Sequence, residues 1–97
     1  MSVLVELTIF PTDKGTSVSP YVARVVNIIR ESGLPCLLGP MGTCLEGEWE
    51  EVMAVVTKCY RELEIDCDRI YMLMKADCRK GAVDRLEGKV QSVEAKL

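Results

Sequence analysis

The order of strand-like and helix-like segments constrains this 97-residue sequence most. Residues 3–10 and 69–78 alternate along the chain and are rich in residues that favour strands, which predicts two long strands. Between them, short apolar runs at 34–38 and 43–46 are close enough to form a hairpin. Helical spacing of apolar residues predicts one helix that the Ser19 hydroxyl caps, with Pro20 at its first position, and that Gly33 ends. A second helix is predicted after Gly47, with Trp49 on its apolar face. A last helix is predicted to begin at Gly81, with a narrow apolar stripe that would pack on one neighbour and consists of Val83, Leu86, Val90, Val93 and Leu97.

This order is β-α-β-β-α-β plus a C-terminal helix, which predicts an α+β fold of the ferredoxin-like sandwich type. Right-handed crossovers then give the sheet order 4-1-3-2, numbered by the strands' order in the sequence. No repeat, linker or low-complexity segment interrupts the chain, so we expect one domain over residues 1–97.

The alternation also predicts which side chains share a face of the sheet. In the first strand Val3, Val5, Leu7 and Ile9 should face the helices, and in the last strand Ile70, Met72, Met74 and Ala76 should do so. The opposite face then combines apolar and charged side chains: Leu4, Glu6, Thr8, Phe10, Glu46, Tyr71, Leu73, Lys75, Asp77 and Arg79. Such a mixture favours a face covered by a second copy of the chain, with polar groups left to pair or to hold a ligand. The alternative is a solvated face with surface ion pairs.

Composition excludes several classes of function. The net charge is −3 and no basic stripe is present, which argues against nucleic acid and anionic membrane surfaces as partners. No apolar run approaches the roughly 18 residues of a membrane span, and the first residues do not resemble a signal peptide, so we expect a cytoplasmic protein. There is no histidine, and the five cysteines form no CxxC pair, so neither a metal site nor a disulfide framework is expected. We interpret the cysteines as small buried apolar residues.

Several segments resemble a known family. They are Ser17-Val18-Ser19-Pro20-Tyr21-Val22-Ala23, Ser32-Gly33-Leu34, Pro40-Met41-Gly42-Thr43, Leu45-Glu46-Gly47-Glu48-Trp49, Glu51-Val52-Met53 and the C-terminal Lys89-Val90-Gln91-Ser92-Val93-Glu94 with Lys96-Leu97. The chain resembles the small single-domain members of the YkoF-like thiamine/hydroxymethylpyrimidine-binding family. The resemblance implies a ferredoxin-like fold, dimers or tetramers, and a site for thiamine or its pyrimidine half. It implies no catalytic activity, and suggests a carrier or sensor with no cofactor other than this ligand.

The polar residues of the predicted face and of two loops suggest how such a ligand would be held. We expect Glu46 and Thr43 to contact the pyrimidine edge, because a carboxylate and a hydroxyl complement its amine and ring nitrogens. Ser17 and Ser19 would close the site. Glu6 or Asp77 would face the thiazolium cation. We further expect the chain to associate with itself through the open sheet face and the C-terminal helix.

Two other functions fit the same residues. The chain could be a structural or regulatory oligomerisation module with no small-molecule ligand, if its contacts pack without a cavity. It could instead be an enzyme that uses paired carboxylates such as Glu6 and Glu46, which would require a raised pKa in a cleft. We favour the binding protein over both.

Overall fold

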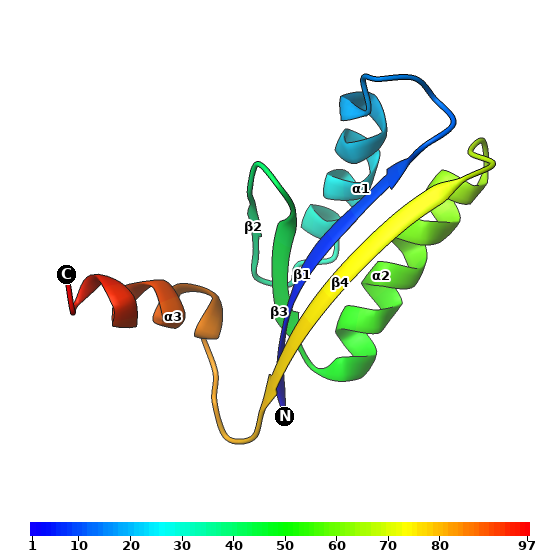
Figure 1. The fold of residues 1–97 in the computed structure, drawn as a ribbon. Helices are drawn as coiled ribbons and strands as arrows, with labels where there is room; N and C mark the ends of the chain where they lie inside the picture. Colours follow the sequence, from blue (N-terminus) through cyan, green and yellow to red (C-terminus); the bar gives the residue numbers. More distant parts are fainter.

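The computed structural model describes residues 1–97, which form four strands and three helices (Figure 1). In chain order the elements are β1 (Ser2–Pro11), α1 (Ser19–Glu31), β2 (Cys36–Leu38), β3 (Thr43–Gly47), α2 (Trp49–Glu64), β4 (Ile70–Arg79) and α3 (Arg85–Glu94). The strands form one antiparallel sheet in the order β2-β3-β1-β4. This confirms the predicted α+β, ferredoxin-like arrangement and its sheet order.

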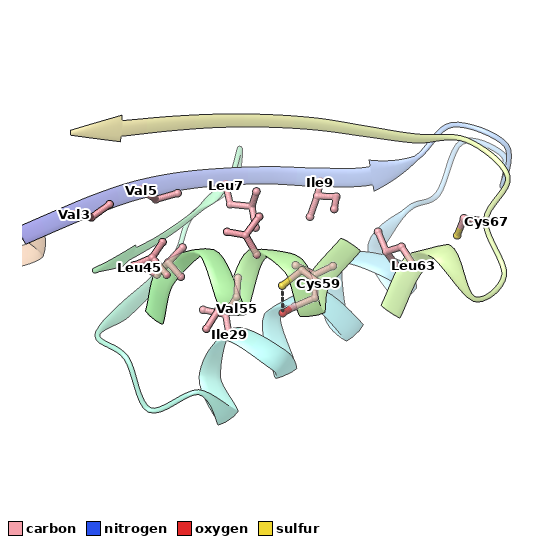
Figure 2. Close-up of a cluster of buried hydrophobic side chains, with 13 residues drawn as sticks. Val3, Val5, Leu7, Ile9, Ile29, Leu45, Val55, Cys59, Leu63 and Cys67 are labelled. Carbon is pink, nitrogen blue, oxygen red and sulfur yellow. Dashed lines mark hydrogen bonds between the residues drawn. The ribbon is translucent and has the colours of Figure 1, made fainter. Parts of the chain in front are cut away.

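The core lies between the sheet and the two helices α1 and α2, which pack on the same face (Figure 2). As predicted, β1 points every second side chain into this core, and these side chains are at most 4% exposed: Val3, Val5, Leu7 and Ile9. Leu45 of β3, Ile29 of α1 and Leu63 of α2 are fully buried against them. The other side of the sheet, which we call the open face, carries Leu4, Glu6, Thr8, Phe10, Leu37, Cys44, Glu46, Tyr71, Leu73, Lys75 and Asp77.

Residues at the helix ends determine where α1 and α2 begin and end. Gly33 has a φ of +77°, which a glycine adopts without steric cost, and it follows the end of α1 as predicted. The hydroxyl of Ser19 was expected to cap α1, but Val18 occupies the N-cap and Ser19 is already helical, so this prediction is wrong. At the start of α2, Glu48 and Glu51 form a reciprocal capping box.

β4 does not bury the side chains that alternation predicts. Its helix-facing residues Met72 and Met74 are 45% and 39% exposed, Ala76 is also exposed, and only Ile70 packs partly against the core. The reason is that β4 is the edge strand, while α2 lies mainly over β1 and β3. Trp49 of α2, predicted on the buried face of that helix, is likewise half exposed. Ile70, Met72, Met74 and Ala76 do point to the helix-facing side of the sheet, as predicted, but the prediction that they are buried there is wrong for all except the partly buried Ile70.

The last helix begins at Arg85 rather than at Gly81. It begins beside the start of β1 and the end of β3 and extends away from α1 and α2 (Figure 1). Only Leu86 of its predicted apolar stripe is partly buried, whereas Val90 and Val93 are largely exposed. The stripe therefore has no neighbour along most of its length within this chain.

Two further expectations concern membrane crossing and the cysteines. None of the three helices is long and apolar enough to span a membrane. All five cysteines are unpaired, and Cys59 and Cys67 are buried as expected, whereas Cys78 is exposed. Burial raises the pKa of the Cys59 thiol to about 11, so this thiol stays protonated within the core.

Candidate functional site

A cavity of about 240 Å³ lies where β1 extends beyond its neighbour β3. The β1–β3 pairing stops at Leu7 opposite Thr43, although β1 continues to Pro11. The space beside the remainder of β1 is enclosed by α1 and by the turn of the β2–β3 hairpin. We call this space the hairpin cavity. Its lining residues are Leu7, Thr8, Ile9, Phe10, Val18, Val22, Val25, Val26, Leu38, Gly39, Pro40, Met41, Gly42 and Thr43.

The turn of the hairpin is fixed in place against β1. Within the turn, the N–H of Gly39 donates to the carbonyl of Gly42 over 2.8 Å. Between the turn and the strand, the hydroxyl of Thr8 donates to the carbonyl of Met41 over 2.7 Å. These two hydrogen bonds determine the shape of the hairpin cavity on its hairpin side.

The hairpin cavity is mainly apolar. Its walls are mainly aliphatic, and none of its lining side chains is ionisable. Thr43 is only 5% exposed, and no hydrogen bond within the chain uses its hydroxyl, which leaves that group available to a ligand. An apolar slot with a few polar groups suits a small planar heterocycle without a phosphate, since orientation then comes from those few groups.

Three of the predicted site residues gather near this cavity. Thr43 lines it, and Val18, which also lines it, stands between Ser17 and Ser19 at the start of α1. Both serines are exposed to solvent, so they border the cavity from outside its apolar interior.

Glu46 lies elsewhere and has a different set of contacts. It is on the open face, whereas Thr43 is on the helix-facing side, so the two do not meet at one ligand edge as the sequence suggested. The Glu46 carboxylate accepts hydrogen bonds from the N–H groups of Arg85 and Leu86 at 2.9 and 3.2 Å and from the Ser2 hydroxyl. Burial acts to raise the pKa of Glu46, but these donors and the Arg85 charge outweigh it, so the pKa lies below its usual value. Glu46 therefore holds the start of α3 on the sheet.

The remaining two predicted residues are paired on the open face. Glu6 forms an ion pair with Lys75 at 3.1 Å, directly across the β1–β4 pairing. Asp77 pairs with Arg85 and Lys89, and the Lys89 ammonium together with the Arg85 charge lowers the pKa of Asp77. Glu6, Glu46 and Asp77 thus lie outside the hairpin cavity, and their carboxylates already have cationic or N–H partners.

Two features of this region were missed by the sequence analysis. Arg85 is only 6% exposed and joins Ser2, Asp77 and the start of α3, but its partners lie up to 83 residues away, so no local pattern indicates it. A second cavity of about 440 Å³, between the N-terminus, the start of α2 and the loop before α3, is lined by Glu46, Glu48, Glu51 and Asp84. It holds no group of side chains suited to a metal ion.

Comparison with known sequences identifies the family. The profile described as "Thiamine-binding protein" matches residues 5–94, which is almost the whole chain. The chain belongs to the thiamine-binding protein family. A relative from Mycobacterium tuberculosis is 37% identical and covers all of this chain and 96% of its own length. One from a Synechocystis species is 35% identical, over all of this chain and 81% of its own length. Both carry the name UPF0045 protein, which states no activity.

Solved structures of similar proteins share the fold. A hypothetical protein from Methanocaldococcus jannaschii superimposes with a TM-score of 0.88 at 30% identity, over 96% of each chain. A Thermotoga maritima protein superimposes with a TM-score of 0.84 at 27% identity, over 96% of this chain and 99% of that one. The description of the latter proposes a role in thiamine biosynthesis or salvage. The family and the fold are therefore consistent with the resemblance noted in the sequence.

Proposed function

We propose that this protein binds thiamine or its hydroxymethylpyrimidine part in the hairpin cavity and releases it unchanged, as a carrier or sensor. The observation that carries the proposal is that the cavity combines aliphatic walls with the unengaged hydroxyl of Thr43 and with the edge of β1 that β3 leaves unpaired beyond Leu7. Family membership supports a thiamine-type ligand, because the matching profile is named for thiamine binding.

The size of the hairpin cavity favours the pyrimidine half as the group that enters. At about 240 Å³ it is slightly smaller than the roughly 300–1,000 Å³ typical of cavities that enclose a drug-sized ligand. A single methylated ring would fill the apolar part. The thiazolium, when present, would lie toward the mouth, where Ser17 and Ser19 offer hydroxyl groups.

The lack of ionisable side chains around the hairpin cavity supports binding rather than catalysis. General acid–base catalysis requires a titratable group within hydrogen-bond reach of the reacting atom. The carboxylates that could serve, Glu6, Glu46 and Asp77, are on the open face and are engaged in ion pairs or hydrogen bonds.

Self-association through the open face and α3 is part of the proposal. The open face exposes Leu73 and Tyr71 beside Phe10, and α3 exposes Val90 and Val93. An oligomerisation module without a ligand is the second candidate function, and it is favoured by the same exposed apolar residues.

Calorimetric titration of thiamine and of 4-amino-5-hydroxymethyl-2-methylpyrimidine into the purified protein tests the proposal. We expect saturable binding, and we expect Thr43→Val to weaken it about three- to tenfold, since it removes one hydrogen bond while keeping the side-chain shape. Thr57→Val is the matched control, because the Thr57 hydroxyl bonds only to its own helix and lies away from the cavity.

Absence of heat at millimolar ligand would reject the binding function and leave the oligomerisation module. Equal affinities for the wild type and Thr43→Val would remove Thr43 from the site.

A further inference from the structure

The backbone groups on the two edges of β1 can be assigned from hydrogen bonds at the borders of the sheet. The N–H of Thr12 donates to the carbonyl of Arg69 over 2.9 Å, in register with the β1–β4 pairing. In an antiparallel pair the N–H and C=O of one residue point the same way and alternate along the strand. Even-numbered residues of β1 therefore point their backbone groups at β4, and odd-numbered residues point theirs at β3.

The hydrogen bonding of β3 gives the same assignment. The N–H of Glu46 donates to the carbonyl of Pro35, so even-numbered residues of β3 face β2 and odd-numbered ones face β1. The odd-numbered pairs Val3–Gly47, Val5–Leu45 and Leu7–Thr43 then exchange the β1–β3 hydrogen bonds.

Ile9 is the next residue in this series and has no partner strand. β3 begins at Thr43, opposite Leu7, so the N–H and C=O of Ile9 point into the space where β3 would have continued. That space is the hairpin cavity, which Ile9 lines, while its side chain is buried in the core at 4% exposure. Backbone polar groups facing an apolar, partly enclosed space require a partner, because leaving them unpaired costs free energy.

We propose that the main chain of Ile9 recognises the ligand by pairing its N–H and C=O with an adjacent acceptor and donor on the ring. This inference rests on the proposed function and names the chemical class within it, a heterocycle with an exocyclic amine beside a ring nitrogen. In a 4-aminopyrimidine, ring nitrogen N3 accepts from the N–H and the 4-amino group donates to the C=O. The ligand thereby takes the place of one residue of the missing strand.

This arrangement discriminates between ring substituents without any charged side chain. A 4-oxo ring presents a donor at N3 and an acceptor at the exocyclic oxygen, the reverse of the 4-amino pattern. To restore both hydrogen bonds it must turn over, which exchanges its 2-methyl and 5-hydroxymethyl positions relative to Thr43 and the walls formed by Val22 and Val25. A ring without the amine leaves the Ile9 C=O unpaired.

The test is an amide-resolved NMR titration of ¹⁵N-labelled protein with three pyrimidines that differ only at position 4: amino, oxo and hydrogen. We expect the Ile9 amide to shift and to exchange more slowly with solvent on binding of the amino compound. The oxo and hydrogen compounds should bind about tenfold more weakly, since each forfeits buried hydrogen bonds. The Met74 amide is the internal control, because it points to the free edge of β4, away from the hairpin cavity, and should not respond.

The outcomes separate the two proposals. If the amino compound binds but the Ile9 amide does not respond, or if all three compounds bind equally, main-chain recognition is wrong and the binding function stands. If none of the three binds, both are wrong.

Discussion

Gly42 is the residue at which the hairpin turn comes closest to β1. A Cβ at this position would lie 2.8 Å from the Thr8 hydroxyl oxygen and 3.2 Å from the backbone carbonyl oxygen of Leu7. Both distances are shorter than normal packing, and the carbonyl cannot move without disturbing the sheet. Glycine at 42 thus permits the Thr8–Met41 hydrogen bond that shapes the hairpin cavity.

We expect Gly42→Ala to destabilise the protein by about 1–3 kcal/mol, because the added methyl group overpacks the contact between turn and strand. Urea unfolding measures this free energy directly. Gly88→Ala is the control, since a Cβ there meets no atom within 4 Å and alanine favours the helix in which it lies. A loss of stability in Gly88→Ala as large as that in Gly42→Ala would contradict the packing explanation.

At the scale of elements, α3 is held by its first residues rather than by an apolar face. The Glu46 carboxylate accepts from the N–H groups of Arg85 and Leu86, and the Arg85 guanidinium donates to the carbonyls of Ser2 and Asp77. These contacts satisfy N–H groups that the start of a helix leaves without partners and place an anion at its positive end. Glu46 thus acts as a cap supplied by another element of the fold.

We expect Glu46→Gln to release α3 at a cost of about 1–3 kcal/mol, because glutamine keeps one acceptor oxygen and replaces the other with an NH2 donor that faces a buried N–H group. Because the pKa of Glu46 is lowered in the folded state, its contribution to stability is complete above its usual value near 4.5 and is lost as the pH falls through the lowered value. Hydrogen exchange of the Arg85 and Leu86 amides between pH 6 and pH 3 measures the release of α3.

The comparison between wild type and Glu46→Gln isolates this carboxylate, since Asp77 also titrates with a lowered pKa. The wild type should become more like the variant as the pH falls. Protection of the Leu86 amide that is the same in both proteins at pH 6 would show that Glu46 does not hold the helix.

The sequence predicted correctly the elements whose apolar and polar residues alternate regularly and that pack against the centre of the core. Val3 to Ile9 identified the buried face of β1, and the order of segments identified the sheet order. Burial of β4 was not predictable from alternation, because alternation does not show that the helices stop short of an edge strand. Glu46 and Arg85 lie 39 residues apart in the sequence and Ser2 lies 83 residues before Arg85, so no local pattern reveals that these residues meet.

The site residues were predicted only in part, because local sequence patterns show which residues are polar but not which of them meet in space. Thr43, Ser17 and Ser19 were chosen from loop chemistry, and the structure places them around one cavity, but their contact with a ligand stays a prediction. Thr43 and Glu46 are three residues apart, and in a strand this spacing puts two side chains on opposite faces. That part of the error was avoidable from the sequence. The cavity itself results from β3 being shorter than β1, which only the register reveals.

At the scale of the whole molecule, the open face and α3 both expose apolar side chains. The open face exposes Leu73 at 54% and Tyr71 at 50%, and α3 exposes Val90 and Val93 at 51% and 60%. Leu37 of β2, on the open face, lines one cavity together with Leu86 and Val90 of α3, so the two regions adjoin at the β2 edge of the sheet. A patch of this kind on a small protein favours an interface over a solvated face.

The proposed self-association predicts that the wild type sediments as a dimer or tetramer and that a charge on either part of this surface reduces its mass. Leu73→Asp would place a carboxylate on the β4 side of the open face, and Val90→Asp would do so on the α3 stripe. A stable interface buries about 800 Å² per partner, a modest share of the 6493 Å² that this chain exposes, and an unpaired buried carboxylate inside it costs several kcal/mol.

Sedimentation velocity across a range of protein concentrations measures the mass, and circular dichroism checks that each variant is folded. Ile65→Asp is the matched control, because Ile65 is similarly apolar and more exposed but lies at the end of α2, away from the open face and α3. If Leu73→Asp alone reduces the mass, the open face forms the interface and the α3 stripe takes no part in it. A monomeric wild type, or an oligomer that all three substitutions leave intact, would mean that this apolar surface does not join copies of the chain.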